Sequence, residues 1–413
     1  MVETEVQKER VILVGVSEQD GDDTKDSLEE LKELVATAGA VTEGMVIQNR
    51  ERIHPGTYVG TGKVSEIKEM VATTGATGIV CDDELSPAQM KNLEDLLDTK
   101  VMDRTLVILD IFAAHASTSE GKIQVELAQL RYSMTRLAGF GRSMSRLGGG
   151  IGTRGPGEKK LEMDKRIIRT RISQLKRELA EVKKHREVAR GQRMRNHVPV
   201  AAIVGYTNAG KSTLLNHLTH AGVLEEDKLF ATLDPTTRQL ELPGKQQILL
   251  TDTVGFIRKL PHHLIEAFKS TLEEAKYADF IIHVVDASNP QADKQMYIVY
   301  NTLRELDIRD KKIVTLFNKM DRPEADRELR DFRADHTARI SARNDRDLET
   351  VKELLAQVLR ENKTYMEHVF SYEDAGKIQV IRRQGELLSE EYTPEGIFVK
   401  AYIPAEVYDR LGI

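Results

Sequence analysis

Between Gly205 and Ser212 the chain has the residue types and spacing of a phosphate-binding loop. In VPVAAIVGYTNAGKSTLLNHL an apolar, strand-like run precedes the glycines, and a helix-like run follows Lys211. Glycines let backbone N–H groups curl around phosphates, Lys211 can reach the β- and γ-phosphates, and the Ser212 hydroxyl can bind Mg²⁺. The pattern predicts a nucleotide site lined by Gly205, Tyr206, Thr207, Asn208, Ala209, Gly210, Lys211, Ser212 and Thr213.

A second Gly-Lys pair, in Gly60-Thr61-Gly62-Lys63-Val64, serves as an internal comparison. Thr57 stands where such a loop needs its first glycine, and Val64 cannot bind magnesium. We interpret this segment as a turn before a helix, with a second anion site as the alternative.

Two further motifs follow strand-like runs in the order that a nucleotide switch requires. In QQILLTDTVGF, Asp252 can hold Mg²⁺ through water, and the N–H of Gly255 can bond the γ-phosphate. Thr253 and Val254 complete this motif. Because Gly255 would contact only the third phosphate, it is a candidate sensor of that phosphate.

The motif Asn318-Lys319-Met320-Asp321 after KIVTLF selects the base. A carboxylate only accepts hydrogen bonds, and guanine offers an N1–H and an amine side by side, which adenine does not. Lys319 can cover the ring face, and Asn318 can tie the motif to the first loop. Ser341, Ala342 and Arg343 match the last base-contacting loop, so the sequence predicts a guanine nucleotide.

The segment LFATLDPTTRQL lies between the first two motifs, where a magnesium-binding threonine is expected. Thr232, Thr236 and Thr237 are all candidates. Phe256 follows Gly255 directly and cannot orient a water, as glutamine does in many GTPases, so intrinsic hydrolysis should be slow. Asn208 is a candidate ligand for K⁺, which could supply the charge of an arginine finger.

The elements around these motifs predict an α/β protein. Residues 10–116 alternate strand-like and helix-like runs, which is typical of a parallel sheet, and Ser86-Pro87 is a helix start. The expected division is an N-terminal parallel α/β domain (1–117), a long basic helical hairpin with a Gly-rich tip (118–196), a P-loop G domain (197–364) and a small C-terminal α+β domain (365–413). In the last, IQVI and GIFVKAYI look strand-like.

Charge is concentrated in the expected hairpin. From Glu120 to Arg195 there are 20 Lys and Arg against 8 Asp and Glu, whereas the whole chain has a net charge of −6. Such a segment is suited to binding a polyanion. Lys and Arg side chains that contact phosphates release counterions from the nucleic acid, and arginine can also stack on unpaired bases. The alternative to RNA binding is that the segment is a long, solvent-exposed charged helix with only a structural role. The candidate RNA contacts have no carboxylate among them: Arg131, Arg136, Arg142, Arg146 and Arg154.

The number of cysteines and the length of the apolar runs indicate the cellular compartment. Cys81 is the single cysteine and cannot form an internal disulfide, which favours a reducing cytoplasm. No apolar run approaches the roughly 20 residues of a membrane span. A cytoplasmic monomer without a transmembrane segment is expected.

Taken together, GYTNAGKSTL, LFATLDPTTR, TDTVGFI, NKMD, YVGTGKVSEI and GGGIGTRGPGEKKLE resemble the HflX-type GTPases of the translation-factor-related group, over nearly the whole chain. The resemblance implies binding to the large (50S) ribosomal subunit and its rRNA, GTP-dependent splitting of stalled or stressed ribosomes, and a hairpin tip near the peptidyl-transferase region. It also implies that Thr232 is the magnesium threonine and that Phe230, Ala231, Leu233 and Asp234 flank the nucleotide. The C-terminal piece varies among such proteins.

Three other functions remain open from the residues alone. These are a GTP-regulated factor for ribosome assembly or RNA modification, a binding module with negligible turnover, and ATP-driven RNA remodelling. The last conflicts with Asp321, because adenine lacks the donor pair that a carboxylate needs.

Overall fold

The computed structural model describes residues 8–18, 23–144, 156–195, 198–219, 229–230, 235–260, 274–325, 327–361 and 363–412. They form two compact units, treated separately below. The first contains the described residues up to 183 together with 229–230 and 258–260, and the second contains the remainder. None of the helices in these ranges has the length and apolar character needed to cross a bilayer.

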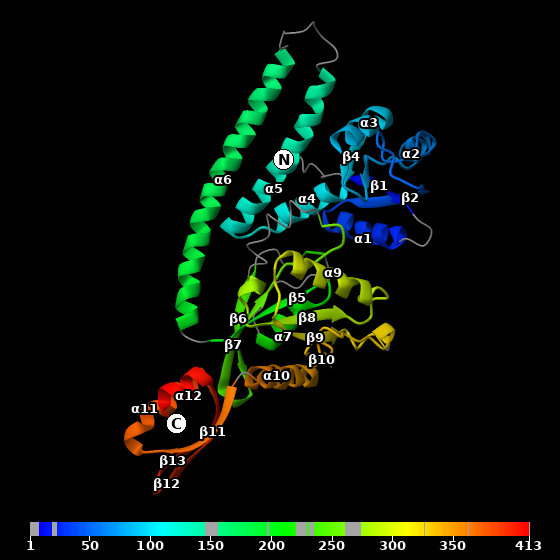
Figure 1. Cartoon of the computed structure of the whole chain (residues 1–413). Helices are drawn as coiled ribbons and strands as arrows, with labels where there is room; N and C mark the ends of the chain where they lie inside the picture. The colour runs from blue at the N-terminus through cyan, green and yellow to red at the C-terminus, as the bar shows by residue number, and fades with distance from the viewer. Residues whose placement is uncertain are drawn as a thin grey trace, which may run out of the picture. The chain divides into compact units, whose positions relative to one another are not determined.

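The first unit begins with a four-stranded parallel sheet in the order β2-β1-β3-β4 (Figure 1). Apolar side chains of its strands and helices form one core. Cys81 is fully buried there, and Ser86 caps its helix in a capping box with Gln89, as predicted. Gly60 is the N-cap of α2, so the segment from Thr61 to Val64 is the first turn of the helix and not a turn before it. The elements are β1 (Arg10–Ser17), α1 (Thr24–Thr37), β2 (Val41–Asn49), α2 (Thr61–Thr74), β3 (Gly78–Cys81), α3 (Pro87–Leu97), β4 (Lys100–Asp103) and α4 (Arg104–His115).

Two long helices, α5 (Ser119–Met144) and α6 (Pro156–Arg195), form the predicted hairpin. Leu127 of α5 packs against Ile172 and Leu175 of α6. Arg171 forms a bidentate ion pair with Glu126, with Nε 2.6 Å from Oε1 and Nη2 2.9 Å from Oε2. A 40-residue helix at 1.5 Å per residue is ~60 Å long. The glycine-rich tip lies outside the described residues.

The second unit contains a six-stranded sheet in the order β10-β9-β8-β5-β7-β6, parallel except for β6. Its strands end at one edge, where the predicted motifs follow them, and α10 packs on its core. The elements are β5 (Val200–Gly205), α7 (Lys211–Thr219), β6 (Thr236–Leu242), β7 (Gln246–Asp252), β8 (Phe280–Asp286), α9 (Ala292–Glu305), β9 (Lys312–Asn318), β10 (His336–Arg339) and α10 (Asp345–Arg360).

A three-stranded antiparallel sheet, β11-β13-β12, completes this unit with α11 and α12 on one face. The prediction that IQVI is a strand is wrong: it lies in α11, where Ile378 and Ile381 both face the sheet core, one helical turn apart. The elements are β11 (Lys363–Phe370), α11 (Ala375–Gln384), β12 (Glu386–Thr393), β13 (Gly396–Pro404) and α12 (Ala405–Leu411). The predicted α/β fold class, with its parallel N-terminal sheet, hairpin, P-loop sheet and C-terminal α+β piece, is confirmed.

Candidate nucleotide-binding site

The loop after β5 has a backbone path that only glycine can follow at two positions. A Cβ on Gly205 would lie 2.3 Å from the carbonyl oxygen of Val284. Gly210 has φ +94°, and its Cβ would lie 2.3 Å from Nδ2 of Asn318. Helix α7 begins at Lys211, so its N-terminus closes the loop. The arrangement is suited to phosphate binding by backbone N–H groups at a helix start.

Lys211 is buried within this loop. Its Nζ donates a 2.8 Å hydrogen bond to the carbonyl oxygen of Tyr206. Burial lowers the pKa of Lys211 to about 8, against the opposing attraction of Asp252. A buried cation is well placed to interact strongly with an anionic ligand, because little water screens it.

The residues predicted to hold magnesium lie next to each other. The Ser212 hydroxyl donates to Oδ2 of Asp252 at 2.7 Å, and Asp252 ends β7, fully buried. One hydroxyl and one carboxylate are the oxygen ligands that fit Mg²⁺, which also takes phosphate oxygens. Thr236 and Thr237 begin β6, paired with β7, and Thr237 Oγ1 lies 3.0 Å from Thr251 Oγ1. Thr232 lies outside the described residues.

Asn318 and Lys319 hold the first loop from the opposite side. Asn318 donates from Nδ2 to the carbonyl oxygen of Ala209, and its Oδ1 accepts from the N–H of Ala342, both at 2.9 Å. Lys319 donates to the carbonyl oxygen of Asn208 at 2.7 Å and forms a 2.8 Å ion pair with Asp286. Asn318 therefore joins three motifs that are far apart in the sequence. Asp286, at the end of β8, is a contributor that the motifs did not indicate.

A depression of about 310 Å³ surrounds the predicted base-selecting carboxylate. The Ser341 hydroxyl donates to Oδ1 of Asp321 at 2.7 Å. This bond lowers the pKa of Asp321 and keeps it an acceptor at neutral pH. Asn344 and Asp347, at the start of α10, also line the depression, and no sequence motif indicates them. The lining residues are Met320, Asp321, Ser341, Arg343, Asn344 and Asp347.

The Asp252–Gly255 motif leads into a backbone bridge to the first loop. The N–H of Phe256 donates to the carbonyl oxygen of Gly205 at 3.0 Å, and the N–H of Thr207 donates to that of Phe256 at 2.8 Å. The Phe256 side chain is buried. A buried aromatic ring cannot orient a water molecule, in agreement with the prediction from sequence.

The second unit thus brings together nearly all the predicted nucleotide residues that the structure describes: Gly205, Tyr206, Thr207, Asn208, Ala209, Gly210, Lys211, Ser212, Thr213, Asp252, Thr253, Val254, Gly255, Asn318, Lys319, Met320, Asp321, Ser341, Ala342 and Arg343. Phe230 is grouped with the first unit and stacks edge-on against Phe112, with centroids 4.7 Å apart. Ala231, Leu233 and Asp234, like Thr232, lie outside the described residues.

The predicted RNA-binding arginines have different surroundings. Arg136 is nearly buried: Nη2 pairs with Asp103 at 2.6 Å, Nη1 donates to the carbonyl oxygen of Leu85, and the guanidinium lies 3.9 Å from the Tyr132 ring centre. Arg136 thus has a role in the fold, where a buried carboxylate needs a partner, and its contact with RNA stays a prediction. Arg131 is half-buried in α5. The Arg142 side chain and all of Arg146 and Arg154 lie outside the described residues.

Comparisons with known proteins agree with this geometry. The chain matches three families, described as GTP-binding GTPase N-terminal (residues 25–113), GTP-binding GTPase Middle Region (115–193) and 50S ribosome-binding GTPase (200–319).

Among relatives, the chain is 67% identical to the GTPase HflX of Lacrimispora saccharolytica, over 100% of this chain and 97% of that one. It is 46% identical to the GTPase HflX of Escherichia coli K12, over 76% and 73%. A crystal structure of a GTP-binding protein from Sulfolobus solfataricus with GDP is 25% identical, with a TM-score of 0.44, over 84% and 98%. With an Asp321 loop and a Gly205–Ser212 loop that fit a guanine nucleotide, and with full-length similarity of this degree, the chain belongs to the HflX family of GTPases, hydrolyses GTP, and has a G domain of the 50S ribosome-binding class.

Proposed function

We propose that this GTPase binds the rRNA of the large ribosomal subunit with its helical hairpin and uses GTP to split or rescue stalled ribosomes in the cytoplasm. The observation that carries the proposal is a basic face on α6. Within the nucleotide site, the residues named above bind GTP with Lys211, Thr232 and Gly255 in catalytic roles. Ribosome assembly is the alternative, and it predicts binding to immature subunits without splitting.

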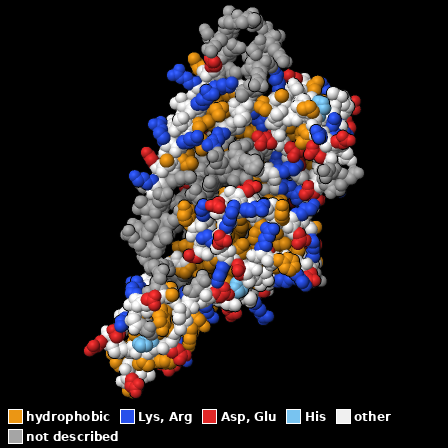
Figure 2. Space-filling view, in the orientation of Figure 1, with side chains coloured by type: hydrophobic (Ala, Val, Ile, Leu, Met, Phe, Trp, Pro, Cys, Tyr) orange, Lys and Arg blue, Asp and Glu red, His pale blue; other side chains and the backbone are white. Residues whose placement is uncertain are grey.

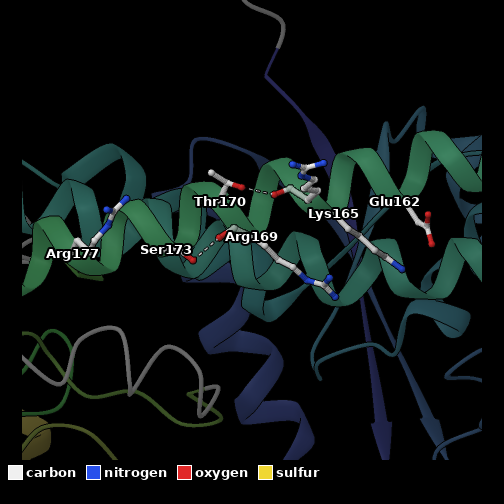
Figure 3. A pocket seen from close by; sticks show the side chains of 7 residues that line it. Glu162, Lys165, Arg169, Thr170, Ser173 and Arg177 are labelled. Carbon is white, nitrogen blue, oxygen red and sulfur yellow. Dashed lines mark hydrogen bonds between the residues drawn. The ribbon is translucent and has the colours of Figure 1, made fainter.

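The basic face comprises Lys165, Arg166, Arg169 and Arg177, on one side of α6 (Figure 3). Their long side chains line a shallow depression of about 700 Å³ together with Glu162, Thr170 and Ser173. Within the described part of the chain, none of the four cations pairs with a carboxylate. Figure 2 shows Lys and Arg side chains along this helix.

The basic face points away from the hairpin core. Ile172 and Leu175 are buried against α5, whereas Arg166, Arg169 and Arg177 are exposed. From Lys165 to Arg177 the face extends ~18 Å at 1.5 Å per residue. A row of exposed cations with short hydroxyl side chains between them suits a phosphodiester backbone, because each neutralised phosphate releases counterions. Because Ile172 and Leu175 pack against α5, the exposed side of α6 is the side available to bind RNA.

Two cations complete the proposed site. Mg²⁺ would be held by Ser212, Asp252 and Thr232, and it would neutralise charge on the β- and γ-phosphates. K⁺ would be held near Asn208, which has φ +60° and whose carbonyl oxygen accepts from Lys319. A cation there would compensate for the absence of a polar side chain at Phe256.

The test is sedimentation of the protein with 50S subunits and 70S ribosomes in sucrose gradients under GTP, GDP and a non-hydrolysable analogue. We expect the analogue to favour the 50S complex and GTP to convert 70S ribosomes into subunits. Binding without any loss of 70S would refute the splitting activity.

A triple variant, Arg166→Ala, Arg169→Ala and Arg177→Ala, tests the basic face. It should weaken 50S binding at 150 mM salt and lower the slope of log affinity against log salt by about 2–3, at ~0.7–0.9 per phosphate. GTP affinity without ribosomes should stay unchanged. Arg309→Ala with Arg330→Ala, on exposed arginines of the second unit, is the matched control. An unchanged salt slope in the triple variant would reject this surface.

A further inference from the structure

The charged side chains of Asp286 and Lys319 meet where two neighbouring strands of the second unit end. β8 ends at Asp286 and β9 ends at Asn318, and these two residues are partners in the parallel register of the sheet. The N–H of Ala287 donates to the carbonyl oxygen of Asn318 at 2.9 Å, so the two backbones stay together beyond the strand ends. The sheet therefore places the Asp286 carboxylate beside Lys319, the next residue of the base-selecting motif.

The ammonium group of Lys319 lies between two acceptors. Its Nζ is 2.8 Å from Oδ2 of Asp286 and donates to the carbonyl oxygen of Asn208, in the phosphate-binding loop, at 2.7 Å. The side chains of Lys319 and Asp286 are only 15% and 12% exposed. An ion pair that is this sheltered from water is screened less than a surface pair, so it can hold the long lysine side chain in one conformation.

A serine fixes the orientation of the Asp286 carboxylate. Its Oδ1 accepts from the N–H of Ser288 at 3.0 Å and from the Ser288 hydroxyl at 2.6 Å. Aspartate commonly makes such a turn with the residue two positions later in the chain. Because Ser288 engages Oδ1, Oδ2 is the oxygen that faces Lys319. One oxygen of Asp286 thus serves the turn after β8, and the other serves the lysine.

The backbone is left-handed at both ends of the hydrogen bond between Lys319 and Asn208. Lys319 has φ +64° and Asn208 has φ +60°. Residues with a Cβ adopt this conformation at a cost in energy, and lysine does so less readily than asparagine. The cost is tolerated where the surrounding contacts require the conformation. The ion pair with Asp286 is such a contact, because it holds the Lys319 side chain against the phosphate-binding loop.

A lysine that is held in this way is prepared to contact the base. A free lysine side chain samples many rotamers, and fixing them when a ligand binds costs conformational entropy. In the proposed site the stem of Lys319 covers one face of the guanine ring. A stem that is already fixed binds the ring at a smaller entropic cost. The phosphates do not gain from this, because Lys211 and the N–H groups of the loop hold them.

We propose that Asp286 is a positioning residue for the nucleotide: with its carboxylate fixed by Ser288, it holds the Lys319 ammonium against Asn208 and so keeps the lysine stem extended over the guanine ring. In this role Asp286 acts through Lys319 and does not need to touch the nucleotide. The inference rests on the nucleotide site of the proposed function and does not depend on ribosome binding. The alternative is that Asp286 only stabilises the turn after β8.

The test measures the binding of GDP, a non-hydrolysable GTP analogue and inorganic triphosphate to the full chain by calorimetry. Asp286→Asn keeps the size of the side chain and removes its charge, and it should weaken the binding of both nucleotides about tenfold. The affinity for triphosphate, which has no base, should not fall. Asp293→Asn is the matched control: it removes an exposed partner of Arg327 at the start of α9 and should leave all three affinities unchanged.

A double-mutant cycle separates positioning from a purely structural role. Lys319→Met keeps much of the stem without its charge. Adding Asp286→Asn to Lys319→Met should weaken GDP binding further by less than about twofold, because the ammonium on which Asp286 acts is already gone. An undiminished effect of Asp286→Asn in the Lys319→Met background, or an equal loss of triphosphate affinity, would show a structural role and overturn the proposal.

Asp321→Asn shows which hypothesis has failed if the result is negative. If Asp321→Asn and Lys319→Met both bound GDP as tightly as the original chain, the base would lie elsewhere, and this inference would be rejected together with the proposed site. If both variants weakened GDP binding and Asp286→Asn did not, only the role of Asp286 would be refuted.

Discussion

The side-chain amide of Asn318 donates a 2.9 Å hydrogen bond to the carbonyl oxygen of Ala209, 109 residues earlier in the chain. Through its Oδ1 the same amide accepts from Ala342, so one buried side chain fixes the phosphate loop and the base loop together. The two ends of the nucleotide site therefore cannot move independently while Asn318 keeps both bonds.

Asn318→Ala should destabilise the protein and weaken nucleotide binding together. It leaves a buried N–H and a buried carbonyl without partners, which costs about 2–3 kcal/mol in free energy of unfolding. Urea denaturation monitored by circular dichroism measures this loss. Asn301→Ala, which affects an exposed hydrogen bond with Arg304, should cost less than about 0.5 kcal/mol. Equal stabilities of the two variants would contradict the bridging role.

Asp321→Asn should change the preferred base. Two charge-assisted hydrogen bonds to guanine are lost, so GTP affinity should fall about 100-fold or more. An amide offers one donor and one acceptor, which complements xanthine with its additional carbonyl. Calorimetry with GTP and XTP measures the exchange. If Asp321→Asn bound GTP as tightly as the original chain, the depression around Asp321 would not be the base site.

The difference between local and distant determinants explains which features could be predicted. The loop from Gly205 to Ser212 and the motif at Asn318 are contiguous, so their residue types are sufficient to indicate their chemistry. The partner of Arg136 is 33 residues away. Only the fold decides such pairings, so the sequence indicates the charge of Arg136 but not its ion pair with Asp103. IQVI in α11 was misassigned for a similar reason, since short apolar runs fit either a strand or a buried helix face.

Arg136→Ala should reduce stability more than it reduces RNA binding. The substitution leaves Asp103 buried with one fewer charged partner, at a cost of about 3 kcal/mol in free energy of unfolding. Thermal and urea unfolding test this. Arg166→Ala, an exposed residue of the basic face, should show the reverse, with intact stability and weaker 50S binding. A fully stable Arg136→Ala protein would contradict this structural role of Arg136.

The pKa of Lys211 predicts the pH dependence of nucleotide binding. Burial lowers it to about 8, and bound phosphates raise it again, because they favour the charged form. The free protein therefore loses the Lys211 proton as pH rises through 8, and binding above that pH must take a proton up. GDP affinity should be constant near pH 7 and fall between pH 8 and 9. Calorimetry at pH 8.5 in two buffers of different ionisation enthalpy should detect proton uptake, and identical heats would exclude it.

Hydrolysis should depend on the monovalent cation. Phe256 is buried and cannot orient water, so another positive group must stabilise the charge that develops on the phosphates. K⁺ near Asn208 could supply it, and Na⁺ prefers a tighter site. We expect single-turnover hydrolysis with 50S subunits to be at least several-fold faster in KCl than in NaCl at equal ionic strength. Asn208→Ala should remove this difference while GDP affinity persists. Equal rates in both salts, with and without subunits, would assign the missing charge to a group of the ribosome.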